Sequence, residues 1–347
     1  MLRAESVDAT TTTMYREAAE APDCVENQLQ ANAATLAALV DQLGSSRPVA
    51  MVTIGRGSSD HAATYARYLA ATRLGILTAS LSPSIFSVFK APLSLPNVLC
   101  LAISQSGRSP DLLAAARGAR DSGAIVVALV NDTNSPLAEI ASIVLPNGAG
   151  LEKSAAATKS FITSLSAIAQ LVALWSGDEA MQAGLSQLPS ALAQAWREDW
   201  SPCRDQLQTA DHLYTVARGL HLAIAQEAAH KLKETCMIHA EAYSSAEVLH
   251  GPNELAGKDF PVLLFRSEDA TDASVEEAAR RLSAQGATVM MAGGGEPGAL
   301  PVPRAPHPVL APILQIQAFY RMANALACDR GQNPDQPRHV QKVTHTI

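Results

Sequence analysis

Small hydroxyl side chains around a glycine form the first group of residues in this sequence that could carry chemistry. Ser104-Gln105-Ser106-Gly107 is followed at once by Ser109. Residues 98–103, before this turn, are an apolar run of strand length, and residues 109–120 have the composition of a helix. A turn between such elements presents free backbone N–H groups and the positive end of the helix dipole. The pattern therefore suits a phosphate monoester.

Other interpretations of such turns remain open at this point. The turn lacks the lysine of a nucleotide P-loop, but a serine-rich turn that only caps its helix has the same composition. A second turn, Gly55-Arg56-Gly57-Ser58-Ser59, follows the apolar residues 49–54 and precedes a helical pattern. Its G-x-G lacks the third glycine of a dinucleotide fingerprint, because Asp60 occupies that position. NAD binding is therefore disfavoured.

Acidic and basic side chains form a second group, within residues 227–252. Glu227, Lys231 and Glu234 stand at i, i+4 and i+7, so they share one helix face. A solvated stripe with one ion pair would have this spacing, but the alanine-rich flanks favour a covered helix, on which such groups must pair or line a cavity. Desolvation would raise the pKa of a glutamate there toward neutral, and Lys231 would restrain the shift. Such a glutamate suits proton abstraction beside a carbonyl.

Histidines in the same segment are weaker candidates. His250 precedes Gly251-Pro252 in a loop, where a histidine is most often merely exposed. His239-Ala240-Glu241 has the H-x-E order of zinc deaminases, but no P-C-x-x-C follows. These two histidines with Glu241 and Glu247 show no recurring ligand spacing, so we expect no metal and no cofactor.

Composition limits the class of protein. The 347 residues are 48% hydrophobic and 17% charged, which favours two globular domains. A net charge of −7 without a Lys/Arg cluster makes nucleic acid an improbable partner. Five scattered cysteines without C-x-x-C indicate no disulfide framework, so a reducing, cytoplasmic setting is expected. No secretory h-region and no apolar stretch of about 20 residues occurs, so no membrane association is expected.

Strand and helix patterns alternate along most of the chain, which predicts parallel, helix-covered sheets. The alternation runs through residues 49–147, weakens over residues 177–204 and starts again at residue 212. We also predict a long apolar helix over residues 155–175. The expected divisions are N-terminal helices at 14–47, a first α/β domain at 48–180, a second at 200–330, and an irregular tail at 331–347.

Several stretches, taken in order, resemble the sugar isomerase (SIS) family. The similarity is to the isomerase half of glucosamine-fructose-6-phosphate aminotransferase and to SIS-type glucosamine-6-phosphate deaminases. The matching stretches are Gly57-Ser58-Ser59, Ser104-Gln105-Ser106-Gly107 with Ser109, Glu152 to Phe161, Lys231 to Glu234, His239 to Tyr243, Glu247 to Pro252, and Asp335 to Arg338 with Lys342.

The resemblance implies a fold, an assembly and a set of roles. It implies two doubly wound parallel-sheet SIS domains, flavodoxin-like with three αβα layers, in a homodimer that shares its active sites. Glu234, beside Lys231, would move a proton between C1 and C2 of an open-chain sugar. His250, supplied to the neighbouring subunit, would assist ring opening, and Lys342 on the tail would reach the C2 region. The implied sugar-phosphate ligands are Gly57, Ser58, Ser59, Ser104, Gln105, Ser106, Ser109 and Ala155.

Departures from the family pattern shape the expected reaction. The chain begins Met1-Leu2-Arg3 and leaves no room for a glutaminase domain, so we expect no internal ammonia source. This favours conversion of glucosamine 6-phosphate into fructose 6-phosphate and ammonia. Lys153 and Ala157 replace parts of a family pattern closer to E-x-G-V-A-S, which bears on the sugar substituent. Alternatives are an aminotransferase-like isomerase, a fructosamine-phosphate deglycase and a non-catalytic sugar-phosphate sensor, although residues 1–48 are too short and too weakly basic for a helix-turn-helix module.

Overall fold

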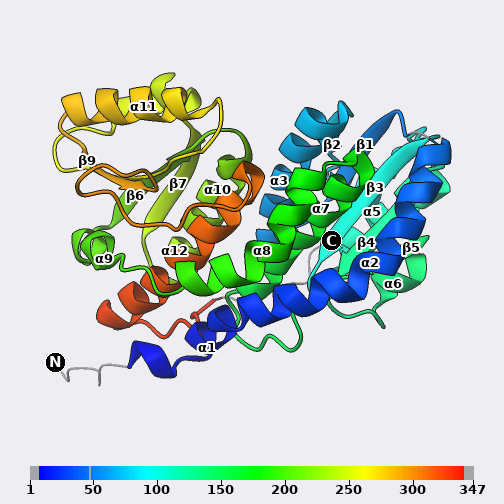
Figure 1. The fold of residues 1–347 in the computed structure, drawn as a ribbon, viewed down its shortest axis with the longest axis horizontal. Coiled ribbons are helices and arrows are strands. Elements are labelled where there is room, and N and C mark those ends of the chain that lie inside the picture. The colour runs from blue at the N-terminus through cyan, green and yellow to red at the C-terminus, as the bar shows by residue number, and fades with distance from the viewer. Residues whose placement is uncertain (1–7, 47, 340–347) are drawn as a thin grey trace. The chain divides into compact units, whose positions relative to one another are not determined.

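The computed structural model describes residues 8–46 and 48–339, which form two compact units (Figure 1). Unit 1 comprises residues 8–22, 153–158 and 187–339, and unit 2 comprises the described residues of 23–152 together with 159–186. Each unit contains one sheet, and every strand pairing in both sheets is parallel. The two parallel α/β domains predicted from the alternating pattern are therefore confirmed.

The sheet of unit 2 has five strands in the order β2-β1-β3-β4-β5. Its central strand β3 is buried at every residue, because a parallel strand covered on both faces can be a continuous apolar run. The register pairs Ile54 of β1 with Ala102 of β3, and Ser104 of β3 with Val130 of β4. The strands are β1 Ala50–Ile54, β2 Thr78–Ser80, β3 Val98–Ser104, β4 Ile125–Val130 and β5 Ile143–Pro146.

Helices cover both faces of this sheet. Helix α5 contacts α4, α6 and strands β1, β3 and β4, and α6 contacts β4. Helix α3 contacts α7 and strands β1 to β3. Helix α2 begins at Ala21, with Pro22 in its first turn, where a proline costs no intrahelical hydrogen bond. The helices are α2 Ala21–Ser46, α3 Ser58–Leu74, α4 Ser84–Ser87, α5 Pro110–Asp121, α6 Pro136–Ile140, α7 Lys159–Ser176 and α8 Glu179–Ala195.

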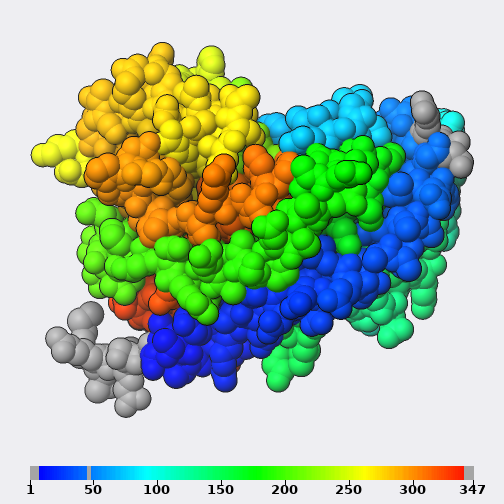
Figure 2. All heavy atoms as spheres, viewed as in Figure 1, coloured from blue at the N-terminus to red at the C-terminus, as the bar shows by residue number. Residues whose placement is uncertain are grey.

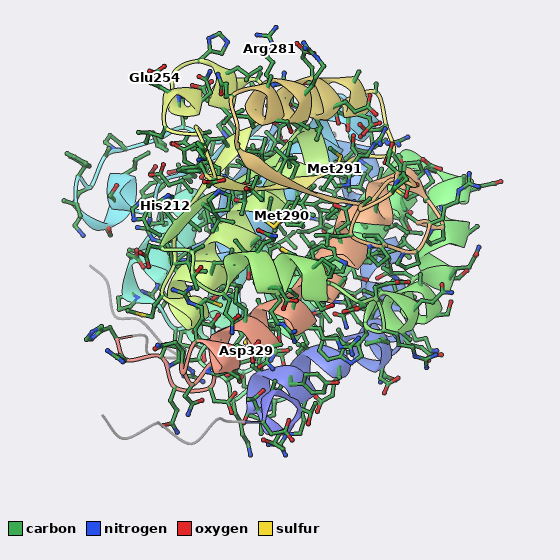
Figure 3. All side chains as sticks on the ribbon, turned by 90° about the vertical axis from the view of Figure 1, so that its left-hand side faces the viewer. His212, Glu254, Arg281, Met290, Met291 and Asp329 are labelled. Atoms are coloured by element: carbon green, nitrogen blue, oxygen red, sulfur yellow. The ribbon has the colours of Figure 1, made fainter. Side chains whose placement is uncertain are left out.

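The sheet of unit 1 has four strands in the order β7-β6-β8-β9. Helix α11 packs on one face through Val275, Ala278 and Leu282, and Arg281 projects from it (Figure 3). Helix α10 contacts β6, β7 and β8 and packs against α12. The elements are α1 Thr13–Ala19, α9 Ser201–Leu207, β6 His212–Ala217, α10 Leu222–Cys236, β7 His239–Ser244, β8 Pro261–Phe265, α11 Asp272–Ala284, β9 Thr288–Ala292 and α12 Ala311–Asp329.

Three segments differ from the sequence expectations. The predicted helix over residues 155–175 begins four residues later, at Lys159, because the Glu152 carboxylate accepts hydrogen bonds from the N–H and hydroxyl of Ser160 in the first turn. The weakly patterned residues 177–204 contain α8 and the start of α9. Strand β7 was not predicted, since it is an edge strand with polar residues.

Candidate active site

The two hydroxyl-bearing turns lie at the topological switch point of unit 2. Strand β1 connects through α3 to β2 on one side, and β3 connects through α5 to β4 on the other. Ligands of open α/β sheets bind in the crevice at such a point, beyond the carboxyl ends of the strands. Because β1 and β3 are parallel neighbours, the turns after Ile54 and Ser104 lie at the same sheet edge. The fold thus brings together the two turns that were noted separately in the sequence.

The turn after β3 is held by one hydroxyl and one glycine. Ser104, 8% exposed, accepts the Gly107 N–H through its Oγ at 3.0 Å. Gly107 has a φ of 63°, and a Cβ there would lie 2.2 Å from the Ser135 hydroxyl. Only glycine can adopt this positive φ without strain and also lie this close to Ser135. Ser109 caps α5 without a side-chain capping bond, so its hydroxyl is available to a ligand.

The turn after β1 leads into α3 and is fixed by backbone contact and an ion pair. A Cβ on Gly55 would lie 2.7 Å from the Ser59 carbonyl carbon, so the chain passes itself too closely for any other residue. Gly57 precedes the helix with a φ of 52°, and Ser58 and Ser59 open the helix. Arg56 donates to Asp111 at 2.8 Å, and this buried carboxylate belongs to the first turn of α5. The ion pair therefore ties the two turns together.

This edge of unit 2 offers an anion neutral donors and the amino ends of two helices. Both nearby guanidinium groups are engaged: Arg56 pairs with Asp111, and Arg108 with Asp132 at 2.7 Å. Hydroxyl groups and backbone N–H groups remain to contact a phosphate. Seven of the eight proposed ligands lie on these two turns, whereas Ala155 lies on the 153–158 segment that clusters with unit 1.

Unit 1 contains the charged group on α10. Lys231 is 1% exposed, and its Nζ lies 2.5 Å from Oε2 of Glu234 and 3.4 Å from Oε1 of Glu227. Tyr320 of α12 donates its hydroxyl to Glu227 at 3.0 Å. His230 lies on the other side, with Nε2 2.9 Å from Oε1 of Glu234. The helix is covered, as its alanine content indicated, and its charged groups are paired.

The pKa of Glu234 differs from the sequence expectation. Burial raises it, but the charge of Lys231 and the hydrogen bond with His230 outweigh burial and hold it at about 2. The expectation of a pKa raised toward neutral was therefore wrong, because the charge of Lys231, with the added hydrogen bond from His230, exceeds the effect of burial. The side chain, 12% exposed, is an ionised carboxylate held between two nitrogen groups.

The remaining predicted residues occupy separate places. His250 is exposed, in the loop between the short helices Glu247–Leu249 and Pro252–Glu254, and its N–H donates to the Glu247 carbonyl at 2.9 Å. Lys342 lies outside the described residues. His230 and Tyr320 were not singled out from the sequence. His230 could have been found by its i, i+4 spacing to Glu234, but nothing local relates Tyr320 to a helix some 90 residues earlier.

Among the described residues, no group of three or more His, Cys, Asp or Glu side chains is arranged to hold a metal ion. Within the same residues, no helix has the length and apolar character needed to cross a bilayer.

The fold and turns define a protein with two doubly wound domains and a flavodoxin-like 2-1-3-4-5 strand order in unit 2. The SIS domain profile matches residues 45–174 and 206–292, and the chain belongs to this family.

Comparison with individual proteins gives the same family. A candidate phosphosugar isomerase from Silicibacter pomeroyi DSS-3 is 44% identical, with a TM-score of 0.89 over 93% of this chain and all of that one. The C-terminal domain of glucosamine-fructose-6-phosphate aminotransferase from Francisella tularensis shares the fold at 23% identity and a TM-score of 0.85, over 94% of this chain and 98% of that one. The isomerizing glutamine–fructose-6-phosphate aminotransferase of Symbiobacterium thermophilum is 31% identical over 95% of this chain and 58% of its own length. The chain thus spans just over half of the curated relatives it matches.

Proposed function

We propose that this protein is a phosphosugar isomerase that converts glucosamine 6-phosphate and water into fructose 6-phosphate and ammonia. The observation that carries the proposal is the Glu234 carboxylate, kept ionised beside the Lys231 ammonium on a covered helix. Proton transfer between adjacent sugar carbons needs one such base. The names of the similar proteins, phosphosugar isomerase and isomerizing fructose-6-phosphate aminotransferase, support a hexose phosphate as the substrate class.

The proposed reaction gives separate residues the tasks of holding the phosphate and of moving the proton. The turns of unit 2 bind the phosphate, and Glu234 removes the C2 proton of the open-chain aldehyde. The resulting enolamine is protonated at C1 by the same carboxyl group, which gives the C2 iminium. Water then adds to C2, and ammonia leaves as the ketose forms. Lys231 keeps the carboxyl group charged between turnovers, because a neutral carboxyl group accepts no proton.

Family resemblance supplies the other roles in the proposal. His250 assists opening of the sugar ring, and Lys342 reaches the C2 region of the ketose. The phosphate ligands are Ser59, Ser104, Gln105, Ser106 and Ser109, with backbone support from Gly57 and Ser58. The homodimer with shared active sites also belongs to this proposal.

Two related reactions use the same proton transfer and differ in the fate of nitrogen. An aminotransferase-like isomerase would form glucosamine 6-phosphate when ammonia is supplied, and a deglycase would release an amine from a fructosamine phosphate. Ammonia and fructose 6-phosphate should therefore be measured in both directions, with a fructosamine phosphate as a third substrate. A protein that binds these sugars tightly and turns over none of them is a sensor, which would contradict the proposal.

Deuterium exchange tests the base independently of the natural substrate. In D2O, the wild-type protein is expected to introduce deuterium at C1 of fructose 6-phosphate, detected by NMR. Glu234→Gln should abolish this exchange and change the affinity for the sugar phosphate by less than about tenfold, or 1.4 kcal/mol. Glu277→Gln, the same change on an exposed face of α11, is the control and should leave the exchange unchanged. Equal loss of binding and exchange in Glu234→Gln would mark that residue as structural.

A further inference from the structure

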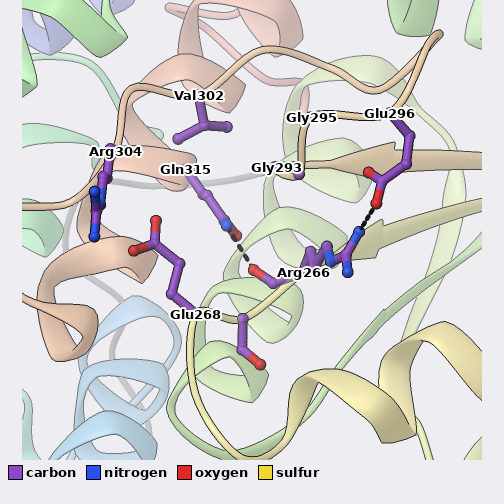
Figure 4. Close-up of a pocket in the computed structure, with 10 residues that line it drawn as sticks. Arg266, Glu268, Gly293, Gly295, Glu296, Val302, Arg304 and Gln315 are labelled. Carbon is purple, nitrogen blue, oxygen red and sulfur yellow. Dashed lines mark hydrogen bonds and ion pairs between the residues drawn. The ribbon is translucent and has the colours of Figure 1, made fainter.

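A cavity of about 420 Å³ lies within unit 1, at the carboxyl ends of β8 and β9 (Figure 4). Its walls come from the turn after β8, the segment after β9, and Gln315 of α12. The segment after β9 lies at the surface beside α11 (Figure 2). Among the residues that the structure describes, none assigned to the proposed isomerase reaction lines this cavity.

Arg266, on the cavity wall, is already neutralised by carboxylates. Its Nε and Nη2 donate to Asp272 at 2.9 to 3.0 Å, and further ion pairs join it to Glu276 and Glu296. The hydrogen bonds with Asp272 and Glu296 raise its pKa. One positive charge thus faces three negative charges, so this arginine does not offer an anion a binding site.

The glycines after β9 make this arrangement possible. Gly293 and Gly294 have φ values of 84° and 88°, a conformation that favours glycine. A Cβ on Gly294 would lie 2.4 Å from the Glu296 carboxylate and 3.0 Å from the Arg266 guanidinium. The glycines therefore let Glu296 approach Arg266 and leave main-chain groups on the cavity wall.

Gln315 presents an unused acceptor at the same place. It is 3% exposed, and its Nε2 donates to the Arg266 carbonyl at 2.7 Å, which fixes the orientation of the amide. Among the described residues no donor reaches its buried Oε1. A buried acceptor without a hydrogen bond is unfavourable, so a ligand that donates a hydrogen bond here is favoured.

Two charged side chains complete the wall. Glu268 accepts a long hydrogen bond, 3.4 Å, from the Ala305 N–H. Arg304 is exposed, and its guanidinium group lies on the same side of the cavity as Glu268 (Figure 4). The lining itself carries two carboxylates, Glu268 and Glu296, and two guanidinium groups, Arg266 and Arg304. Asp272 and Glu276 pair with Arg266 as well, so carboxylates outnumber guanidinium groups around this wall. A dianionic phosphate would be repelled there, whereas an ammonium group and hydroxyl groups would find acceptors.

We propose that this cavity binds a small polyhydroxylated amine without a phosphate group, of the free amino sugar class. Its ammonium group pairs with Glu268, one donor satisfies Gln315 Oε1, and Arg304 donates to a sugar oxygen. This site is distinct from the proposed phosphate-binding turns of unit 2. It would select a positively charged ligand, whereas those turns would select a negatively charged one.

Calorimetry with glucosamine tests the proposal on the full-length protein. The titration is done at about pH 6, where an amine of this type is protonated. Glucosamine should bind at least about tenfold more tightly than glucose, and saturating fructose 6-phosphate, which occupies the proposed isomerase site, should not compete. Glucosamine 6-phosphate should show no binding that depends on Glu268.

Variants locate the binding. Glu268→Gln should weaken glucosamine binding about tenfold and leave C1 deuterium exchange at the wild-type rate. Glu277→Gln, outside the cavity, is the matched control and should bind glucosamine as the wild type does. Equal affinity for glucose and glucosamine, competition by fructose 6-phosphate, an unchanged Glu268→Gln titration or no binding of glucosamine would each overturn the proposal. The exchange assay reports separately on the isomerase function, so the two proposals fail independently.

Discussion

The turn after β3 in unit 2 and the turn after β8 in unit 1 occupy equivalent places in their sheets, yet their chemistry is opposite. Each strand is the third strand of its unit in chain order. In each sheet it pairs with the first strand, on the side opposite the second strand. Ser104-Gln105-Ser106-Gly107 is neutral, and its hydroxyl and N–H groups suit an anion. The turn after β8 carries Arg266, Glu268 and Asp269 and is surrounded by further carboxylates. Repetition of a fold within one chain has therefore not repeated its ligand.

The two turns also differ in how they are closed. In unit 1 the switch point is filled: Gly219, after β6, lies against Thr271, whose hydroxyl bonds to Asp269 at 2.6 Å and to Ser267 at 2.9 Å. His221 is buried beside these turns. In unit 2 the equivalent turns are tied by the Arg56–Asp111 ion pair. Internal hydrogen bonds fill the switch point of unit 1 between β6 and β8. Its cavity lies one strand further along the sheet, at the ends of β8 and β9.

The buried charges of unit 1 should produce the largest effect on stability. Lys231→Met removes the buried ammonium group that lies between the Glu227 and Glu234 carboxylates. The free energy of unfolding, measured with urea, should fall by about 3 to 5 kcal/mol. Lys233→Met, at an exposed position on the same helix, is the control and should stay within about 0.5 kcal/mol of the wild type. Similar midpoints for the two variants would contradict the picture of a paired interior network.

Two glycines, Gly107 after β3 in unit 2 and Gly219 after β6 in unit 1, give the second test. Gly107→Ala places an alanine in the left-handed conformation and makes its Cβ overlap with the Ser135 hydroxyl. Together these effects should lower the free energy of unfolding by about 2 to 5 kcal/mol. Gly219→Ala has a similar φ of 59°, but its Cβ would meet Thr271 at 3.3 Å, so the loss should be only about 1 to 2 kcal/mol. Urea unfolding of both variants measures the difference. An equal loss would show that conformation alone, and not the Ser135 contact, requires Gly107.

Local patterns in the sequence predicted the turns, but they could not predict contacts between residues that are distant in the chain. Strand β3 and its turn were recognisable because a fully buried parallel strand is apolar throughout and its turn is adjacent in the chain. Helix α8 was missed although Met181, Leu185, Leu188 and Leu192 keep the helical period, because Pro189 interrupts the composition.

The charge state of Glu234 shows the same limit. Spacing places Lys231 and Glu234 on one face, but the pKa of the carboxyl group depends on every group near it, and the charge of Lys231 together with His230 outweighs burial. Likewise, the bond from Tyr320 to Glu227 depends on the packing of α12 against α10. Periodicity gives the face of a helix but does not give its neighbours.

His221 makes unit 1 sensitive to acid, which is the third test. Burial lowers the pKa of this imidazole to about 4, although Asp269 and Asp272 oppose the shift, and both ring nitrogens lack partners among the described residues. The unfolded chain binds the proton first, so this contribution to stability is complete above about pH 6.5 and is lost as pH falls to about 4, by no more than about 3 kcal/mol. His221→Leu should reduce the difference in unfolding free energy between pH 7 and pH 4.5.

Exposed His212 supplies the control for that series, since His212→Leu should retain the wild-type pH dependence. If His221→Leu and His212→Leu give the same slope, the acid sensitivity arises elsewhere in the protein.

The smallest effect should come from single hydroxyl groups and bears directly on the contrast between the turns. Ser106→Ala removes one neutral donor from the turn after β3 and should weaken binding of fructose 6-phosphate by about 0.5 to 1.5 kcal/mol, measured by calorimetry. Ser267→Ala removes a hydroxyl from the equivalent turn after β8, where carboxylates exclude phosphate, and should leave that affinity unchanged. Loss of affinity in Ser267→Ala would mean that both turns contact phosphate and that the difference in charge between them does not select the ligand.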